Sequence, residues 1–479
     1  MNNRIKIPPL HLVLYGSMVT LLIFSLSYYK LRVAFSDSAS YLTDITRNDG
    51  FFVAHGRFVS VLNQWIPFFL VKAGASLKAL AVAYSFNYSL APVLFSLICM
   101  HWLKRPYHAL AIMMLVLLMN SLLFYYTCSE LQMGLTVLLF YDAVVDRMKE
   151  KRSWPTFLLL TFLLMPFIAF SHPTNIAVFA GWVVYRMIRR WSDYRYVSIA
   201  GVWYIASYLA KKAWFTTTYE ASQMVTWETF RPFGLNYYNG PFARSFYKYF
   251  VSEAFMVGVV FILMIVMLLW LRKYKLLVFV TGTMAVLFTI IVIKFENWSS
   301  HFYDHYHEHM MQTVIFFLVL SFSYGMSKIP GRPYLKAAIV AIVFVISLAK
   351  INSGREALIA RQKWLYNCLA LMDKLGLKKA AAGRVWVPEG MTRGTFWSSS
   401  WETLILSSLE GPENSKTLFL AWNIDEVKEP VYKTDEFISD ANTYPQNTLP
   451  QQYFRLDDKP YVFLEHVVPD SVLEHLRWQ

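Results

Sequence analysis

The sequence predicts an all-α polytopic membrane protein with about eleven transmembrane helices and a small C-terminal extracytoplasmic α/β domain. Two observations lead to this prediction. The 479-residue chain is 56% hydrophobic and only 16% charged, whereas a soluble domain carries about 25% charged residues. The deficit is concentrated in long apolar runs, and about 20 such residues form a helix that crosses the hydrocarbon layer.

The apolar runs divide the first 350 residues into predicted spans. The first run has no A-x-A-like cleavage site after it, so we expect a retained helix. Residues 30–57 are too polar to span and form an external loop. Residues 57–72 predict a helix lying in the membrane interface, with a short second span as the alternative. The predicted spans cover roughly residues 10–29, 80–102, 108–127, 131–146, 156–171, 174–190, 196–214, 251–271, 276–294, 310–327 and 335–350.

Residues 351–479 predict a separate C-terminal domain of mixed α/β structure. An amphipathic helix is expected over residues 354–375. Short strand-like runs follow at residues 384–387, 417–422 and 461–466, and a helix-like run at 401–409 separates the first two.

Charge is distributed unevenly along the chain. Residues 1–350 contain 31 Lys and Arg against 14 Asp and Glu, whereas residues 351–479 contain 14 against 17. The basic excess therefore lies in short loops between apolar runs, which indicates contact with membrane lipids and argues against nucleic acid as a partner. Counting basic residues in these loops places the N-terminus in the cytoplasm and the C-terminal domain outside. The three cysteines form no CxxC metal motif and no disulfide framework.

The first external loop contains the candidate general base. Asp37 follows the first span closely, so its carboxylate is expected near the membrane surface, where it can accept a proton from a hydroxyl group. Asp44, Asp49, His55 and Arg57 lie in the same loop. The alternative is that these residues are solvated polar groups of a loop, and the sequence leaves open which aspartate is the base.

Two short external turns add candidate substrate-binding residues. Glu130 follows Cys128 and Ser129 in a short turn and is a candidate for contact with substrate. The alternative is a purely structural helix start, in which Ser129 is the N-cap and Glu130 is favoured in the first turn by the helix dipole. His172 precedes Pro173 and is a candidate for contact with substrate. The favoured alternative is a structural one, in which the proline only marks the start of the next helix.

The loop before the tenth span is rich in histidine and acidic residues. On a helix, His301, Asp304 and His305 share one face, as do Asp304, His307 and Glu308. Either set can ligate a divalent cation such as Mg or Mn, or hold a phosphate when its histidines are protonated. The alternative is an interfacial belt of His and Tyr.

The long external loop at residues 215–250 is rich in aromatic residues and contains Arg231 and Arg244. Aromatic faces stack on sugars and arginine binds phosphate oxygens in a fork, so this loop is a candidate substrate-binding segment. An aromatic membrane belt is the alternative. Lys211 and Lys212, at the outer end of a span, are expected to reach lipid headgroups or a lipid phosphate.

The acidic residue in FSDSASY and the Gly-Arg-aromatic step in HGRF, His55 to Phe58, resemble the GT-C superfamily of glycosyltransferases. The chain is most similar to the bacterial branch related to O-antigen glucosyltransferases of the second type. Many members have two adjacent acids in the first loop, whereas here Ser38 follows Asp37.

The resemblance implies a hexosyltransferase, usually inverting, in the bacterial inner (cytoplasmic) membrane. Its donor would be a polyprenyl-phosphate-linked sugar, and a cell-envelope glycan or glycolipid would accept the sugar on the extracytoplasmic face. Asp37 would be the base, and Arg57, Arg231 or Arg244 would stabilise the departing lipid phosphate. Glu130 and the histidine cluster would position substrate or a cation.

Three other functions remain open. An O-antigen polymerase or ligase would depend on Arg and His more than on Asp. A transporter or lipid flippase is disfavoured because the predicted spans contain almost no ionisable residues at mid-depth. A non-enzymatic envelope assembly protein would tolerate single substitutions in its external loops.

Overall fold

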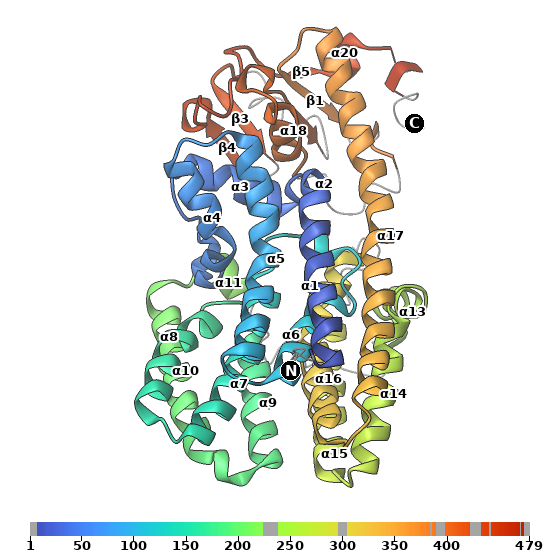
Figure 1. The fold of residues 1–479 in the computed structure, drawn as a ribbon. Coiled ribbons are helices and arrows are strands. Elements are labelled where there is room, and N and C mark those ends of the chain that lie inside the picture. Colours follow the sequence, from blue (N-terminus) through green and yellow to red (C-terminus); the bar gives the residue numbers. More distant parts are fainter. Residues whose placement is uncertain are drawn as a thin grey trace, which may run out of the picture.

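The computed structural model of the chain describes residues 7–223, 238–295, 304–383, 386–388, 398–421, 433–439, 442–469 and 471–473. Helices dominate these residues, and a small group of strands lies at one end of the helical bundle (Figure 1). The helices up to residue 374 are α1 (Pro9–Ser27), α2 (Tyr29–Val33), α3 (Asp37–Arg47), α4 (Val61–Lys72), α5 (Leu77–His101), α6 (Pro106–Leu117), α7 (Glu130–Lys151), α8 (Trp154–Ala169), α9 (Asn175–Arg189), α10 (Tyr194–Trp214), α11 (Thr218–Gln223), α13 (Pro241–Ser252), α14 (Phe255–Trp270), α15 (Tyr274–Phe295), α16 (Asp304–Lys328) and α17 (Pro333–Lys374).

Local sequence signals explain where several helices begin. Ser76 and Ser129 accept hydrogen bonds from the backbone N–H three residues later and so cap α5 and α7. Proline occupies the first turn of α1, α6, α8, α13 and α17, where its missing N–H costs no helical hydrogen bond.

Five described helices are long and apolar enough to cross a membrane, namely α1, α5, α15, α16 and α17. Helices α13 and α14 together form a sixth candidate, bent by 81°. These helices support a membrane-embedded helical protein. A helix lies at each of the eleven predicted spans, but α6 and α8 have only 12 and 16 residues. The larger count therefore stays a prediction.

The predicted boundary at residues 350 and 351 falls inside α17, which runs unbroken for 42 residues, so the predicted separate helix over residues 354–375 is part of α17 and the division into two domains stays a prediction. This helix lies along α1 and continues to the strands at the end of the bundle (Figure 1). Gly354, which lies at the predicted break, is needed for packing. A Cβ atom there would lie 2.6 Å from the Ser121 carbonyl oxygen.

The described residues after α17 contain both strands and helices, and the strands differ from the predicted ones. The first strand is β1 (Lys379–Gly383), which ends before the predicted run at 384–387 begins. It pairs in parallel with β2 (Thr417–Ala421) and with the short strand β5 (Val462–Phe463). The remaining elements are α18 (Ser399–Ser408), the antiparallel pair β3 (Glu436–Ser439) and β4 (Asn442–Pro445), and α20 (Leu464–Val467).

Buried polar contacts attach this α/β unit to the helices. Arg361 on α17 donates hydrogen bonds of 3.0 Å from Nε and Nη2 to the two carboxylate oxygens of Glu402 on α18. Glu402 also accepts a 3.1 Å hydrogen bond from the Ser36 backbone N–H, just before α3. The α/β unit is therefore held against the segment that carries Asp37.

Helix α4 covers most of the predicted interfacial segment at residues 57–72. Its polar residues Asn63 and Gln64 are each 1% exposed, whereas Phe69 is 63% exposed. Gln64 is bonded to both backbone groups of Phe52. An outward apolar face suits a helix in contact with lipid, and its interfacial position stays a prediction.

We expect Glu402→Gln to loosen the α/β unit. The substitution removes the charge that pairs with the buried Arg361 guanidinium at Glu402, and breaking a buried pair typically costs about 3–5 kcal/mol. Thermal unfolding of the full chain in detergent, together with limited proteolysis after α17, measures the effect. Glu410→Gln is the matched control, because the Glu410 pair with Lys78 is exposed. Equal melting temperatures for the two variants would contradict the structural role of Glu402.

Candidate functional site

Five segments distant in sequence meet at one end of the bundle. They are the start of α3, the turn at Ala54–Gly56 with Arg57, the start of α7, α11 and the start of α16. The contacts that join them place the predicted residues Asp37, Arg57, Glu130 and His305 in one cluster. The structure thus brings together side chains that lie up to about 270 positions apart in the sequence.

Asp37 is the first residue of α3 and is half-buried. The Tyr126 hydroxyl donates a hydrogen bond to Asp37 Oδ2. The other oxygen, Oδ1, makes no hydrogen bond within the described residues. Burial raises the pKa of Asp37 to about 6, with Glu130 acting in the same direction and Tyr126 and Arg57 opposing it. The carboxylate is thus mostly charged at pH 7 but a better proton acceptor than an ordinary aspartate.

Arg57 lies between two buried carboxylates. Its Nε donates a 2.6 Å hydrogen bond to Glu220 Oε1 and its Nη1 a 3.5 Å bond to Glu130 Oε2. Burial would lower the pKa of Arg57, but these two carboxylates and Tyr41 raise it above the usual value, so the guanidinium stays charged. Nη2 makes no hydrogen bond within the described residues and remains able to bind an anion.

Glu130 and Glu220 are each fully engaged by neighbours. Tyr41 donates a hydrogen bond to Glu130 Oε1, and Lys211 Nζ lies 3.4 Å from Glu220 Oε2. Ser129 caps α7 as the alternative interpretation expected, and Glu130 additionally fixes Arg57.

Histidines form a second side of the cluster. The His305 and His309 rings lie one turn apart on α16, with centroids 5.7 and 6.1 Å from the Tyr126 ring. The His172 ring is 5.6 Å from that of His309. Burial, and then Arg57 and His309, lower the pKa of His172 well below its usual value, so it is neutral at pH 7.

His55 stacks on Tyr219 at 4.3 Å between ring centroids, beside Arg57. Gly56 separates these two residues with a φ of +67°, and a Cβ there would lie 2.8 Å from Phe215 Cβ. Only glycine fits this position without strain.

The structure separates other predicted residues from this cluster. Asp44 pairs with Arg47 at 2.7 Å on its own helix, and Arg244 is exposed on α13. Arg231 and His301 lie outside the described residues, as does the side chain of Asp304. Of the predicted set His301, Asp304 and His305, the structure therefore describes only the side chain of His305. A divalent cation held by this set stays a prediction.

The alternative cation set of Asp304, His307 and Glu308 is less suitable, because the Glu308 carboxylate is already hydrogen-bonded within the protein. Its carboxylate accepts hydrogen bonds from the backbone N–H of Leu122 and Leu123 and from the Tyr249 hydroxyl. Glu308 thus holds the turn that follows α6.

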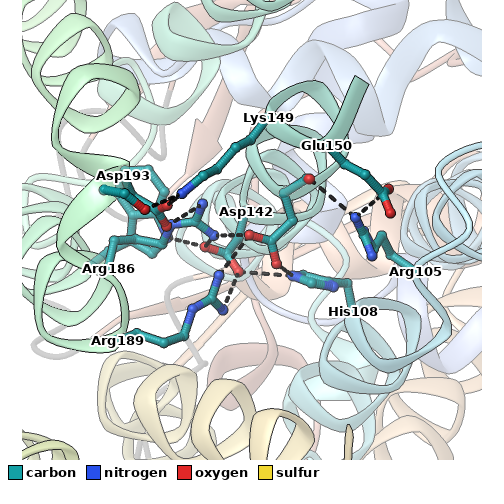
Figure 2. A network of polar contacts seen from close by, with 11 residues as sticks. Arg105, His108, Asp142, Lys149, Glu150, Arg186, Arg189 and Asp193 are labelled. Atoms are coloured by element: carbon teal, nitrogen blue, oxygen red, sulfur yellow. Dashed lines mark hydrogen bonds and ion pairs between the residues drawn. The ribbon is translucent and has the colours of Figure 1, made fainter. Parts of the chain in front are cut away.

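A second buried polar network lies toward the other ends of α7 and α9. Asp142 accepts hydrogen bonds from Trp182 Nε1 (2.8 Å) and Arg186 Nη1 (3.0 Å), and His108 Nε2 lies 2.9 Å from it (Figure 2). Arg186 and Arg189 both bind Asp146, at 2.8 and 2.7 Å. The sequence analysis did not identify this network, although Asp142 and Arg186 lie toward the ends of the predicted spans 131–146 and 174–190; both are fully buried.

His108, Asp142 and Asp146 also place one ligand atom each within 4.8 Å of one another. A divalent cation there would lie beside the guanidinium groups of Arg186 and Arg189, which already neutralise both carboxylates. We therefore interpret this network as ion pairing between helices.

Sequence reasoning missed Tyr41, Tyr126, Glu220 and His309. Tyr41 lies one turn after Asp37 and His309 one turn after His305, so helical spacing could have found these two. Tyr126 lies inside a predicted span, and Glu220 is an isolated acid in a threonine-rich segment, so neither carries a local signal.

Comparisons of the chain with protein-family models, with curated proteins and with solved structures find no match.

We expect Gly56→Ala to displace His55 and Arg57 and to destabilise the fold. The positive φ alone costs an alanine about 1–2 kcal/mol, and the contact with Phe215 adds to this. Thermal unfolding of the full chain measures the loss. Gly201→Ala is the matched control, since nothing lies within 4 Å of a Cβ in the middle of α10. A melting temperature unchanged in both variants would contradict the close approach at Gly56.

Proposed function

We propose that the protein is a glycosyltransferase that moves a sugar from a polyprenyl-phosphate carrier to a glycan or glycolipid of the cell envelope. The observation that carries the proposal is the half-buried Asp37 carboxylate, with one unengaged oxygen, in the same cluster as the Arg57 guanidinium. A hydroxyl acceptor needs a base, and a departing phosphate needs a cation.

The contacts of the first-loop aspartates favour Asp37 as the base. Asp44 is paired with Arg47, and the exposed Asp49 is paired with Lys72. Asp37 alone among these three accepts its hydrogen bond from a neutral hydroxyl and makes no ion pair, although burial raises the pKa of Asp44 to about 6 as well.

In the proposed reaction, Asp37 takes the proton of the acceptor hydroxyl as the acceptor oxygen attacks the anomeric carbon. The bond between that carbon and the phosphate oxygen breaks, and the phosphate leaves with the electron pair. Arg57, through Nη2, stabilises the charge of the departing phosphate. Glu130 and Glu220 hold Arg57 in place.

The sidedness of the proposal rests on the basic loops. Lys104, Arg152, Arg190 and Lys328 lie at the helix ends away from Asp37, which the charge pattern assigns to the cytoplasm. The proposed site would then face the extracytoplasmic side of a bacterial inner membrane.

We expect Asp37→Asn to reduce sugar transfer by about 10²–10⁴-fold, because general-base catalysis contributes about this much. The assay incubates purified protein with radiolabelled polyprenyl-phosphate hexoses and envelope extract and follows the label into acceptor. Asp49→Asn, in the same loop but exposed and outside the cluster, should retain activity. Full transfer by Asp37→Asn would favour a polymerase or ligase, and no transfer of any tested hexose would contradict the proposal.

We also expect a pH dependence set by Asp37. The base acts only when deprotonated, so the rate should be constant above about pH 7, be halved near pH 6 and fall tenfold per unit below pH 5. Initial rates are measured between pH 4.5 and 8. The melting temperature is measured over the same range and must stay constant, so that a loss of rate does not reflect unfolding. A rate that stays constant down to pH 5 would exclude Asp37 as the base.

A further inference from the structure

A cavity of about 730 Å³ opens between the ends of four helices, far from the Asp37 cluster. Its lining comes from the turn before α6, the last turns of α7 and α9, and the end of α16. Helices α7 and α16 start at the Asp37 cluster, where Glu130 and His305 lie, and residues near their C-terminal ends line this cavity. Since α7 has 22 residues, the two sites are about 25–30 Å apart.

The cavity has a large excess of positive charge. Its acidic lining residues are already neutralised, since Asp146 pairs with Arg186 and Arg189, and Glu150 pairs with Arg105 and Arg147 at 2.8 and 2.7 Å. Four further basic lining residues have no ion pair within the described part of the chain, namely Lys104, Arg152, Arg190 and Lys328.

The floor of the cavity is rigid and holds part of this charge in place. Arg189 is fixed by Asp146 and lies 5.6 Å from the centre of the Tyr324 ring, and Lys328 lies 5.8 Å from the same ring on its own helix. His108 and Arg189 connect this floor to the buried Asp142 network (Figure 2). Preformed cations in a concave site recognise phosphate better than scattered surface lysines do.

Positive charge at this end of a membrane protein is expected in any case from the positive-inside rule. That rule requires basic residues in loops, but it does not require them to line a cavity. The turn between α14 and α15 shows the ordinary case: Arg272, Lys273 and Lys275 are exposed there and none of them lines the cavity.

We propose that this cavity binds a phosphate-bearing anion, independently of the site around Asp37. The ligand is either the headgroup of an anionic phospholipid or a soluble phosphate compound. Both present the same chemistry to Lys104, Arg152, Arg190 and Lys328, and basic pockets between helices on this side of a membrane suit such headgroups.

The test uses the full chain in neutral detergent at low salt and follows thermal unfolding during titration with one of three probes. Phosphatidylglycerol represents the lipid source, inorganic pyrophosphate the soluble source, and phosphatidylcholine is the zwitterionic control. The double variant Arg190→Gln with Lys328→Gln removes two exposed, unpaired charges, so its fold should be retained. The matched control, Lys273→Gln with Lys275→Gln, removes the same charge at the same end.

We expect one anionic probe to raise the melting temperature of the wild type, with its apparent Kd increased about tenfold or more in the cavity variant, because that variant removes two of the four unpaired charges and a tenfold change corresponds to only about 1.4 kcal/mol. The control variant should bind like the wild type. A response to phosphatidylglycerol alone identifies a headgroup site, and a response to pyrophosphate a soluble ligand. No response to either probe, or equal weakening in both variants, would overturn the proposal.

Discussion

Helix α7 is buried along most of its length and carries carboxylates toward both ends, and each of these needs a positive partner inside the bundle. Glu130, at the first residue, receives Arg57 from the first external loop. Asp142, in the second half of the helix, receives Arg186 from α9. Removing one member of a buried pair typically costs about 3–5 kcal/mol. The positions of the first loop and of α9 therefore both depend on the charges of α7.

This constraint explains why a polar loop folds so tightly against an apolar bundle. Arg57 links the first loop to both α7 and α11, because it binds Glu130 and Glu220 together. Lys211 adds a link from α10 to the same Glu220 carboxylate. The same contacts that hold the loop also leave Asp37 at its edge with one oxygen unengaged. The proposed base is thus positioned by residues that take no part in proton transfer themselves.

Hydrophobic runs in the sequence located the helices, since a helix lies at each predicted span, but α6 ends at Leu117, ten residues before the predicted end of its span at residue 127. The runs could not reveal how far a helix continues. The span predicted to end at residue 350 and the helix predicted from residue 354 are one helix, and Gly354 within it is required by the close approach of the Ser121 carbonyl. In the candidate site, the sequence identified Asp37, Arg57 and Glu130 by their places in external segments. It could not pair Arg57 with Glu220, because the two are 163 positions apart and no local pattern relates them.

Hydrogen-bond saturation distinguishes the structural carboxylates of this protein from Asp37, the proposed base. Asp142 is surrounded by an arginine, a tryptophan and a histidine. Glu308 accepts from two backbone N–H groups and a tyrosine, and Glu402 accepts from Arg361, Ser398 and a backbone N–H. Each of these carboxylates has its acceptor atoms in use, so each stabilises contacts between elements and has little capacity for a substrate. Asp37 has a single neutral donor and a raised pKa, which is the state expected of a group that must accept a proton from a molecule that is not yet bound.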